Sequence, residues 1–165
     1  MSDYQQFMEE GHSAAWERDW KTAIEAYSRA VQSATEDADA HINLGMALLR
    51  DMQLDRALKV FKRAQQLAPE DPVPLEGQAE TYAEMGQNEE ASRQLVKVSE
   101  FYLQQRDLIK AISVWEHATA LTPGLVSVHA RLAQAYERVD RKEDALRSYL
   151  ILGNIFQQII CILKL

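Results

Sequence analysis

The chain has 165 residues, of which 47% are apolar and 26% are charged, and this composition excludes both a disordered chain and a bundle of membrane spans. Its 25 acidic residues outnumber its 18 basic ones, whereas a protein that follows nucleic-acid phosphates needs clustered Lys and Arg. The single cysteine, Cys161, forms no disulfide within the chain, and the first residues lack the apolar core of a signal peptide. We therefore expect a cytoplasmic protein that binds no nucleic acid.

Alanine recurs along the chain at a fixed interval. Ala23, Ala57 and Ala91 lie 34 residues apart, and so do Ala111 and Ala145. Each alanine is followed by a large apolar residue after four positions and by a further apolar residue after three more, which is the spacing of one helix face. The large residues are Tyr27, Phe61, Leu95, Trp115 and Tyr149.

A small residue lies twelve positions before each of these alanines, and it marks a first helix that precedes the alanine-bearing one. Antiparallel helices approach closely only where side chains are small. Pro69 and Pro123 follow Ala57 and Ala111 by twelve residues, where proline ends a helix without loss of an internal hydrogen bond. The pattern predicts helix–turn–helix units with small residues at Gly11, Gly45, Ala79, Ser99 and Ala133.

The period breaks between Ala91 and Ala111, which are only 20 residues apart. We therefore expect one helix, near residues 89–105, to close the third unit and to open the fourth. A longer repeat of 54 residues follows, and by that register a turn and a further helix should begin at Ile160, the counterpart of Arg106. An apolar tail stands there instead.

Three interpretations of this tail remain open. It is part of a longer repeat array, it folds back or pairs with a second copy, or it enters a membrane. The last is disfavoured because a span needs about 20 apolar residues, and Asn154, Gln157 and Gln158 interrupt a shorter stretch.

This pattern resembles the tetratricopeptide repeat family, whose helix–turn–helix units are about 34 residues long. The match is most specific over residues 38–71, where the family positions read His41, Leu44, Gly45, Leu48, Ala57, Phe61, Ala64 and Pro69. The resemblance implies an all-α, right-handed solenoid of about four and a half units over residues 4–158. The units lie near 4–37, 38–71, 72–105, 92–125 and 126–158, the third and fourth overlapping, and an apolar tail occupies 159–165.

No pattern typical of catalysis, of a cofactor site or of a metal site occurs in the sequence. His41 and His129 stand at the family's first aromatic position, so we expect packed imidazoles rather than metal ligands. The acidic pair Glu89 and Glu90 recurs as Glu143 and Asp144 at the start of a later helix, where acids stabilise the helix dipole. We therefore predict no enzymatic activity, no cofactor and no metal.

The resemblance implies that the first helix of each unit lines a concave, partner-binding groove. An apolar strip is mixed there with acids, which predicts a non-enzymatic scaffold for a basic or amphipathic peptide or helix. The family's clamp for chaperone C-termini is not implied, because only Asn43 matches it. The predicted groove residues are Met8, Glu9, His12, Trp16, Asp39, Ile42, Asn43, Met46, Leu49, Arg50, Glu76, Glu80 and Glu84.

Two alternative functions remain beside the scaffold. The chain could be a structural repeat fragment that self-associates through its C-terminal helix, because exposed apolar patches mark interaction sites. It could also be the regulatory arm of a longer multidomain protein. The apolar strip of the groove could then be covered by the chain's own last helix or by a neighbouring repeat.

Overall fold

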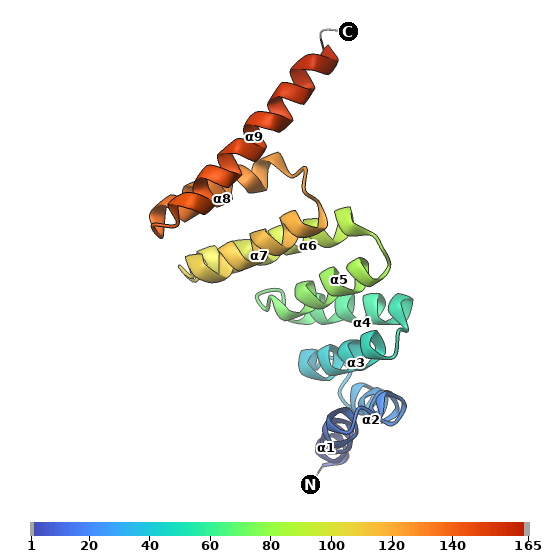
Figure 1. Cartoon of the computed structure of the whole chain (residues 1–165). Coiled ribbons are helices and arrows are strands. Elements are labelled where there is room, and N and C mark those ends of the chain that lie inside the picture. The colour runs from blue at the N-terminus through green and yellow to red at the C-terminus, as the bar shows by residue number, and fades with distance from the viewer. Residues whose placement is uncertain (1, 164–165) are drawn as a thin grey trace. The chain divides into compact units, whose positions relative to one another are not determined.

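The computed structural model describes residues 2–163, and these residues form helices joined by short turns (Figure 1). They divide into two compact units that meet between Gln87 and Asn88. The first unit holds α1 (Asp3–Trp16), α2 (Trp20–Ser33), α3 (Ala38–Arg50), α4 (Leu54–Leu67) and α5 (Val73–Glu84). The second holds α6 (Asn88–Gln104), α7 (Leu108–Leu121), α8 (Val126–Arg138) and α9 (Lys142–Leu163).

Side-chain caps set where several helices begin. The Ser2 hydroxyl accepts a hydrogen bond from the backbone N–H of Gln5, whose side chain in turn accepts one from Ser2 N–H, which is a complete capping box. Asp19 and Asp107 cap α2 and α7. The hydrogen bonds that Thr22 donates lower the pKa of the Asp19 carboxyl, and the backbone N–H of Lys110 lowers the pKa of Asp107.

The turns that precede α2, α4, α6, α7 and α9 each contain a residue in the left-handed backbone region. Gly86 has φ of 73°, and the same conformation occurs at Arg18, Met52, Arg106 and Asp140 with φ of 58–60°. The first three of these turn positions, 18, 52 and 86, are 34 residues apart, so the repeat extends to the backbone. Four of the five turns place a residue with a Cβ in a conformation that glycine adopts more easily.

We expect Met52→Gly to raise the free energy of unfolding by about 0.5–1 kcal/mol, because relief of the left-handed strain outweighs the added entropy of the unfolded chain. The Met52 side chain is exposed, so little packing is lost. The reciprocal control is Gly86→Ala, whose Cβ would meet no atom within 4 Å and which should therefore lose stability through its backbone alone. Urea unfolding followed by circular dichroism measures both. A loss of stability in Met52→Gly would contradict this account.

The core of the first unit is built around Phe61 of α4, whose side chain is completely buried. Its ring lies against the backbones of two glycines on neighbouring first helices. A Cβ built on Gly45 of α3 would lie 2.7 Å from the ring, and one built on Gly77 of α5 would lie 2.4 Å from it. Gly11 of α1 makes the same approach to the Tyr27 ring, at 2.4 Å. The small residues thus serve the close packing that their spacing predicted.

The second unit has its own core and a polar network beside it. Trp115, Leu132 and Tyr136 are buried in one apolar cluster. The Tyr136 hydroxyl of α8 donates to a Glu116 carboxylate oxygen of α7 at 2.7 Å. Burial, followed by the neighbouring Glu116 carboxylate, raises the pKa of Tyr136.

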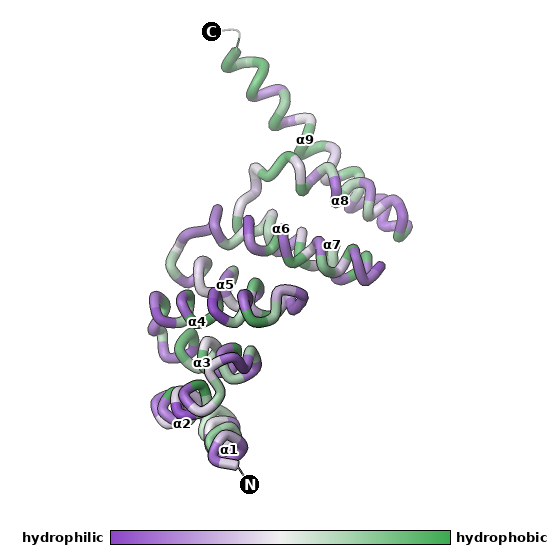
Figure 2. The backbone as a smooth tube through the Cα atoms, turned by 180° about the vertical axis from the view of Figure 1, so that it is seen from behind, coloured by the Kyte–Doolittle hydropathy of each residue, from purple (hydrophilic) through white to green (hydrophobic). Residues whose placement is uncertain are grey.

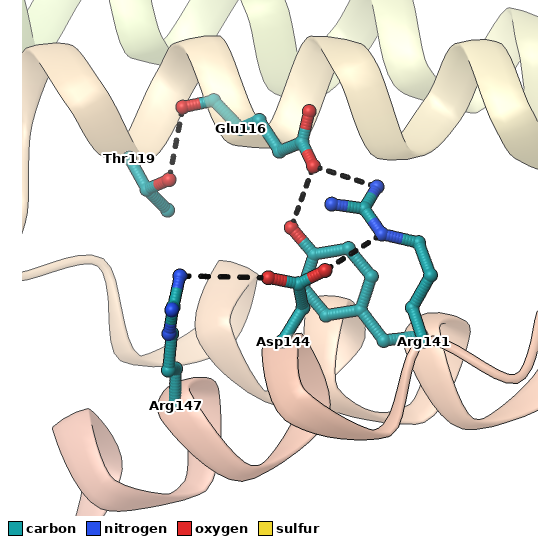
Figure 3. Close-up of polar contacts among 6 residues, drawn as sticks. Glu116, Thr119, Arg141, Asp144 and Arg147 are labelled. Carbon is teal, nitrogen blue, oxygen red and sulfur yellow. Dashed lines mark hydrogen bonds and ion pairs between the residues drawn. The ribbon is translucent and has the colours of Figure 1, made fainter.

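Arg141 extends this network to the start of α9, as Figure 3 shows. Its Nη1 donates to Glu116 at 3.0 Å and its Nε donates to Asp144 at 2.8 Å. The guanidinium also lies over the Tyr136 ring, 4.5 Å from its centre. Glu116, Tyr136, Arg141 and Asp144 therefore join α7, α8 and α9 into one packed body.

The 54-residue register is correct for the position of the long helices but wrong for the turn at Ile160. α6 is a single helix that pairs with α7, whereas its role in closing the third unit involves both compact units and stays a prediction. α9 continues as helix through Leu163 where the turn was expected. At the earlier turn, Arg106 takes a positive φ and Asp107 caps the next helix, but isoleucine and cysteine at 160 and 161 suit neither role. Residues 164–165 of the predicted tail lie outside the described residues.

α9 is 22 residues long, and its last turns are predominantly apolar (Figure 2). By length and composition alone it could cross a membrane, a test that core helices of soluble proteins also meet. Only 6% of the most apolar 18-residue stretch of this helix is buried. The tail at 159–163 is therefore the exposed end of a continuous helix rather than a separate segment.

Candidate binding face

The predicted groove residues all lie on α1, α3 and α5 of the first unit. We call this set the binding face. Corresponding residues recur every 34 positions, so that Trp16, Arg50 and Glu84 occupy the ends of the three helices. The 34-residue repeat thus places a tryptophan, an arginine and a glutamate at equivalent positions of successive repeats.

One ion pair connects two of these helices directly. Arg50 of α3 donates from Nη1 to Glu80 Oε1 of α5 at 2.7 Å, and both side chains are about half exposed. A surface pair of this kind contributes little to stability. Its effect on the face is electrostatic, because the one cation among the predicted residues is already engaged by an acid.

The remaining acids leave the binding face negatively charged. Glu9 and Asp39 are exposed on α1 and α3, and Glu84 is exposed at the end of α5. Asn43 turns its amide back to the Asp39 carbonyl oxygen, to which Nδ2 donates at 2.8 Å. The side chain that matches the family's carboxylate clamp is therefore bonded to its own helix, on a face with the wrong charge for a carboxylate.

Apolar side chains supply the other half of the binding face. The Trp16 side chain is 90% exposed at the end of α1, which is exceptional for an indole. Met8 and Met46 are partly buried against the first core, and Ile42 is also partly buried. The His12 ring lies edge-on to Tyr27, with ring centres 5.7 Å apart. Trp16 is therefore the most accessible apolar anchor on the face.

One predicted residue does not belong to this surface. Leu49 is 2% exposed and packs in the core of the first unit. The carried-over register places it at the edge between the lining positions and the helix–helix contact, and packing against the core takes it inward. Glu76 and Glu80 are both partly buried on α5, so the exposed acid of this helix is Glu84.

The structure also contains a recess that the sequence did not indicate. It has a volume of about 630 Å³ and lies between α2 and the turn that joins α3 to α4. Both signs of charge line it, with Lys21, Arg29 and Arg56 beside Glu25 and Asp51. The repeat pattern indicates the first helix of each unit as the lining of a groove. This recess is instead formed by α2, α4 and a turn, so the pattern did not predict it.

Comparison with known proteins finds a family match within the first unit. Residues 8–72, which span most of α1 to the turn after α4, match the tetratricopeptide repeat family model. This part of the first unit is similar to tetratricopeptide repeats. A search of curated proteins finds no significant match to the whole sequence.

Solved structures of tetratricopeptide repeat proteins share the fold. The TPR2B domain of yeast Sti1, in a complex with pHsp70, has a TM-score of 0.65 and 18% identity over 72% of this chain and 97% of that one. MamA residues 41 to the end, from Desulfovibrio magneticus RS-1, have a TM-score of 0.54 and 15% identity over 96% of this chain and 97% of that one. These likenesses confirm the predicted all-α repeat fold.

The tetratricopeptide positions also account for the histidines. His41 and His129 are buried, as predicted for the first aromatic position. His41 Nδ1 lies 2.7 Å from the Asp37 carbonyl oxygen, and His129 Nε2 lies 2.9 Å from that of Pro123. Over residues 2–163, no group of three His, Cys, Asp or Glu side chains is arranged to hold a metal ion.

Proposed function

We propose that the chain is a non-enzymatic scaffold whose binding face captures a basic or amphipathic peptide or helix of a partner protein. The observation that carries this proposal is the exposure of the Trp16 indole at 90% on a face whose other exposed side chains are largely acidic. Tryptophan is enriched among the residues that dominate binding energy, because its large apolar surface is buried when a partner docks.

The charges and the apolar residues have separate roles in this proposal. Glu9, Asp39 and Glu84 attract a basic segment and set its register, because complementary charge chiefly affects the association rate and specificity. Trp16 then holds the segment by burial. Met8 and Met46 are flexible and polarisable, and they adapt to the partner's apolar side chains.

The relatives support the coarser part of the proposal. Tetratricopeptide repeats generally form protein-interaction surfaces rather than catalytic sites, and the similar TPR2B domain of Sti1 was determined in a complex with pHsp70. The chemistry of the partner is inferred here from the charge and exposure of this chain's own residues.

A charge reversal on the face tests the proposal. We expect Glu84→Lys to weaken binding of an alternating Lys–Leu peptide of twelve residues about 5–10-fold, because it replaces an attraction with a repulsion. Isothermal titration calorimetry measures this affinity. Glu84 is preferred over Glu80, since reversal of Glu80 would also leave Arg50 beside a like charge.

The matched control is Glu100→Lys, which reverses the charge of another exposed glutamate, on α6 of the second unit. It changes the net charge by the same amount, so an effect of overall charge would appear in both variants. Trp16→Ala should weaken binding by about tenfold or more if the indole is the anchor. Equal affinities in the Glu84 and Glu100 variants, together with an unaffected Trp16 variant, would refute the binding face.

A further inference from the structure

α9 presents two different faces along its length. Ala145, Ser148 and Leu152 are buried, and they pack α9 into the second unit. A neighbouring face of the same helix is exposed and carries residues at alternating spacings of three and four. We call this face the α9 seam; its residues are Leu146, Tyr149, Gly153, Phe156, Ile160 and Leu163.

The seam follows the heptad pattern of helices that pair with another helix. Its six residues occupy the two apolar heptad positions in strict alternation over the described length of α9. Phe156 is 51% exposed and Leu163 is 80% exposed. Arg147, Asn154 and Gln158 lie at helical spacing on the opposite side. Off the seam, Leu150, Ile151, Ile159 and Ile162 are exposed as well, but they do not continue its heptad spacing.

The corresponding face of α6 is largely buried. By the 54-residue register, the seam residues from Leu146 to Phe156 correspond to Ser92, Leu95, Ser99 and Tyr102 of α6. The first three of these are buried, and the Ser92 hydroxyl donates to the Ala118 carbonyl oxygen of α7 at 3.0 Å. The equivalent face of α9 has no such cover among the described residues.

Gly153 forms a notch in the middle of this open face. A Cβ built there would meet no atom within 4 Å, whereas one built on Gly45 would lie 2.7 Å from the Phe61 ring. Both glycines occupy the small-residue position of a first helix by register. The notch therefore has room for a large side chain from a second helix.

We propose that the α9 seam binds the same seam of a second copy of this chain, with the two helices antiparallel. An antiparallel arrangement pairs Gly153 with Phe156 of the other copy, Tyr149 with Ile160, and Leu146 with Leu163. The two-fold axis repeats the pair of Gly153 and Phe156, so the glycine notch of each copy receives the phenylalanine ring of the other. A parallel arrangement would instead oppose two glycines and two phenylalanines, which leaves a void in one layer and crowds another.

The available area suits a reversible dimer. The exposed seam side chains carry on the order of 600 Å² of apolar surface per chain, or about 1,200 Å² for two chains, which is the lower limit for specific, stable interfaces. We therefore expect a dissociation constant of about 1–100 µM. The inference concerns the second unit and stands independently of the proposed function of the first.

A lipid bilayer fits the same helix less well. Arg147, Asn154 and Gln158 would face hydrocarbon, where polar side chains are costly. The first turns of α9 are also fixed to α8 by the buried face and by the Tyr149 hydroxyl, which donates to Glu137 at 3.2 Å. A helix that is anchored to α8 at its start and carries these polar residues opposite the seam is suited to a protein partner.

Sedimentation equilibrium of the full chain at about 1–200 µM tests the dimer, a range that spans the expected dissociation constant. The mass of the unmodified chain should rise from 18.8 kDa towards twice that value. Ile160→Asp should weaken dimerisation at least about tenfold, because it places a charge in the seam. The matched control, Ile162→Asp, introduces the same charge at an exposed residue two positions away and off the seam, and it should change the constant less than about twofold.

Gly153→Leu distinguishes packing from folding defects. The monomer has space for the new side chain, so helix content by circular dichroism should be retained while dimerisation weakens about tenfold.

The orientation of the two α9 helices is tested by disulfide cross-linking in a Cys161→Ser background. Tyr149→Cys and Ile160→Cys chains should cross-link to each other, and neither should cross-link to itself.

Several results would contradict the proposed dimer. A chain that stays monomeric over the whole range, or equal losses in the Ile160 and Ile162 variants, would overturn the seam. Cross-linking of Tyr149→Cys chains to one another would overturn the antiparallel arrangement. Flotation of a monomeric chain with phosphatidylcholine and phosphatidylserine vesicles, lost equally in both aspartate variants, would show that the helix binds membranes instead.

Discussion

Phe61→Ala should lower the free energy of unfolding of the first unit by about 3–5 kcal/mol, the largest effect that we expect from a single substitution in this chain. The Phe61 side chain is completely buried. Its ring also contacts two helix backbones at once, those of α3 at Gly45 and α5 at Gly77. Removal of the ring leaves a cavity that neither glycine can fill, because neither has a side chain.

Urea unfolding monitored by circular dichroism measures this loss, with hydrogen exchange of α3–α5 amides to assign it to the first unit. The control is Phe101→Ala in α6, where the ring is only partly buried and the expected loss is roughly 1–2 kcal/mol. Equal losses in the two variants would contradict the role of Phe61 as the centre of the first core.

Gly77→Ala should lower the stability of the same unit by about 1–3 kcal/mol, although alanine is the better helix former. The new Cβ would lie 2.4 Å from one Phe61 ring atom and within 2.7 Å of two others. Because Gly45 approaches the same ring atoms and the Phe61 side chain is completely buried, the ring has little freedom to move. The steric cost should therefore exceed the helix-propensity gain of about 1 kcal/mol.

A double-mutant cycle with Phe61→Leu isolates this contact. The smaller leucine side chain should relieve the clash, so we expect the two substitutions to couple by about 1 kcal/mol or more. Gly124→Ala is the control, because its Cβ would meet no atom within 4 Å. Additive effects in the cycle, or a stabilised Gly77→Ala variant, would show that α5 does not pack on Phe61 as described.

The repeat period was the most predictable part of the fold. The spacing of Ala23, Ala57 and Ala91 and the small residues at Gly11 and Gly45 predicted the helix pairs, because close packing of antiparallel helices restricts what each position can hold. Residue type at those positions is therefore informative on its own, and the structure confirms the resulting contacts.

The turns and the limits of the surface were less predictable. Arg18, Met52 and Arg106 take the left-handed conformation, but long side chains give no local sign of it, because the strain is imposed by the packing of the helices on each side. Leu49 is apolar like its surface neighbours, and only its burial distinguishes it. Pattern alone identifies a helix face, whereas its boundary depends on how closely the next helix packs.

The end of α9 illustrates the same limit in another way. The 54-residue register predicted a turn at Ile160, and the local sequence determined the outcome. The β-branched Ile160 stands where Arg106 takes a positive φ, and no capping carboxylate lies between Gln158 and Leu163, so the helix continues to Leu163. A repeat register indicates where a turn is expected, but the residues present must be able to form it.

The binding face is the central claim, and its most direct test is NMR chemical-shift mapping with the alternating Lys–Leu peptide. Backbone amide spectra of the ¹⁵N-labelled chain would be recorded during titration, together with the Trp16 indole N–H. We expect the largest shifts at Trp16 and along α1, α3 and α5, with α7 and α8 unaffected. Shifts confined to the recess beside α2, or spread evenly over both units, would contradict a binding face formed by the first helices.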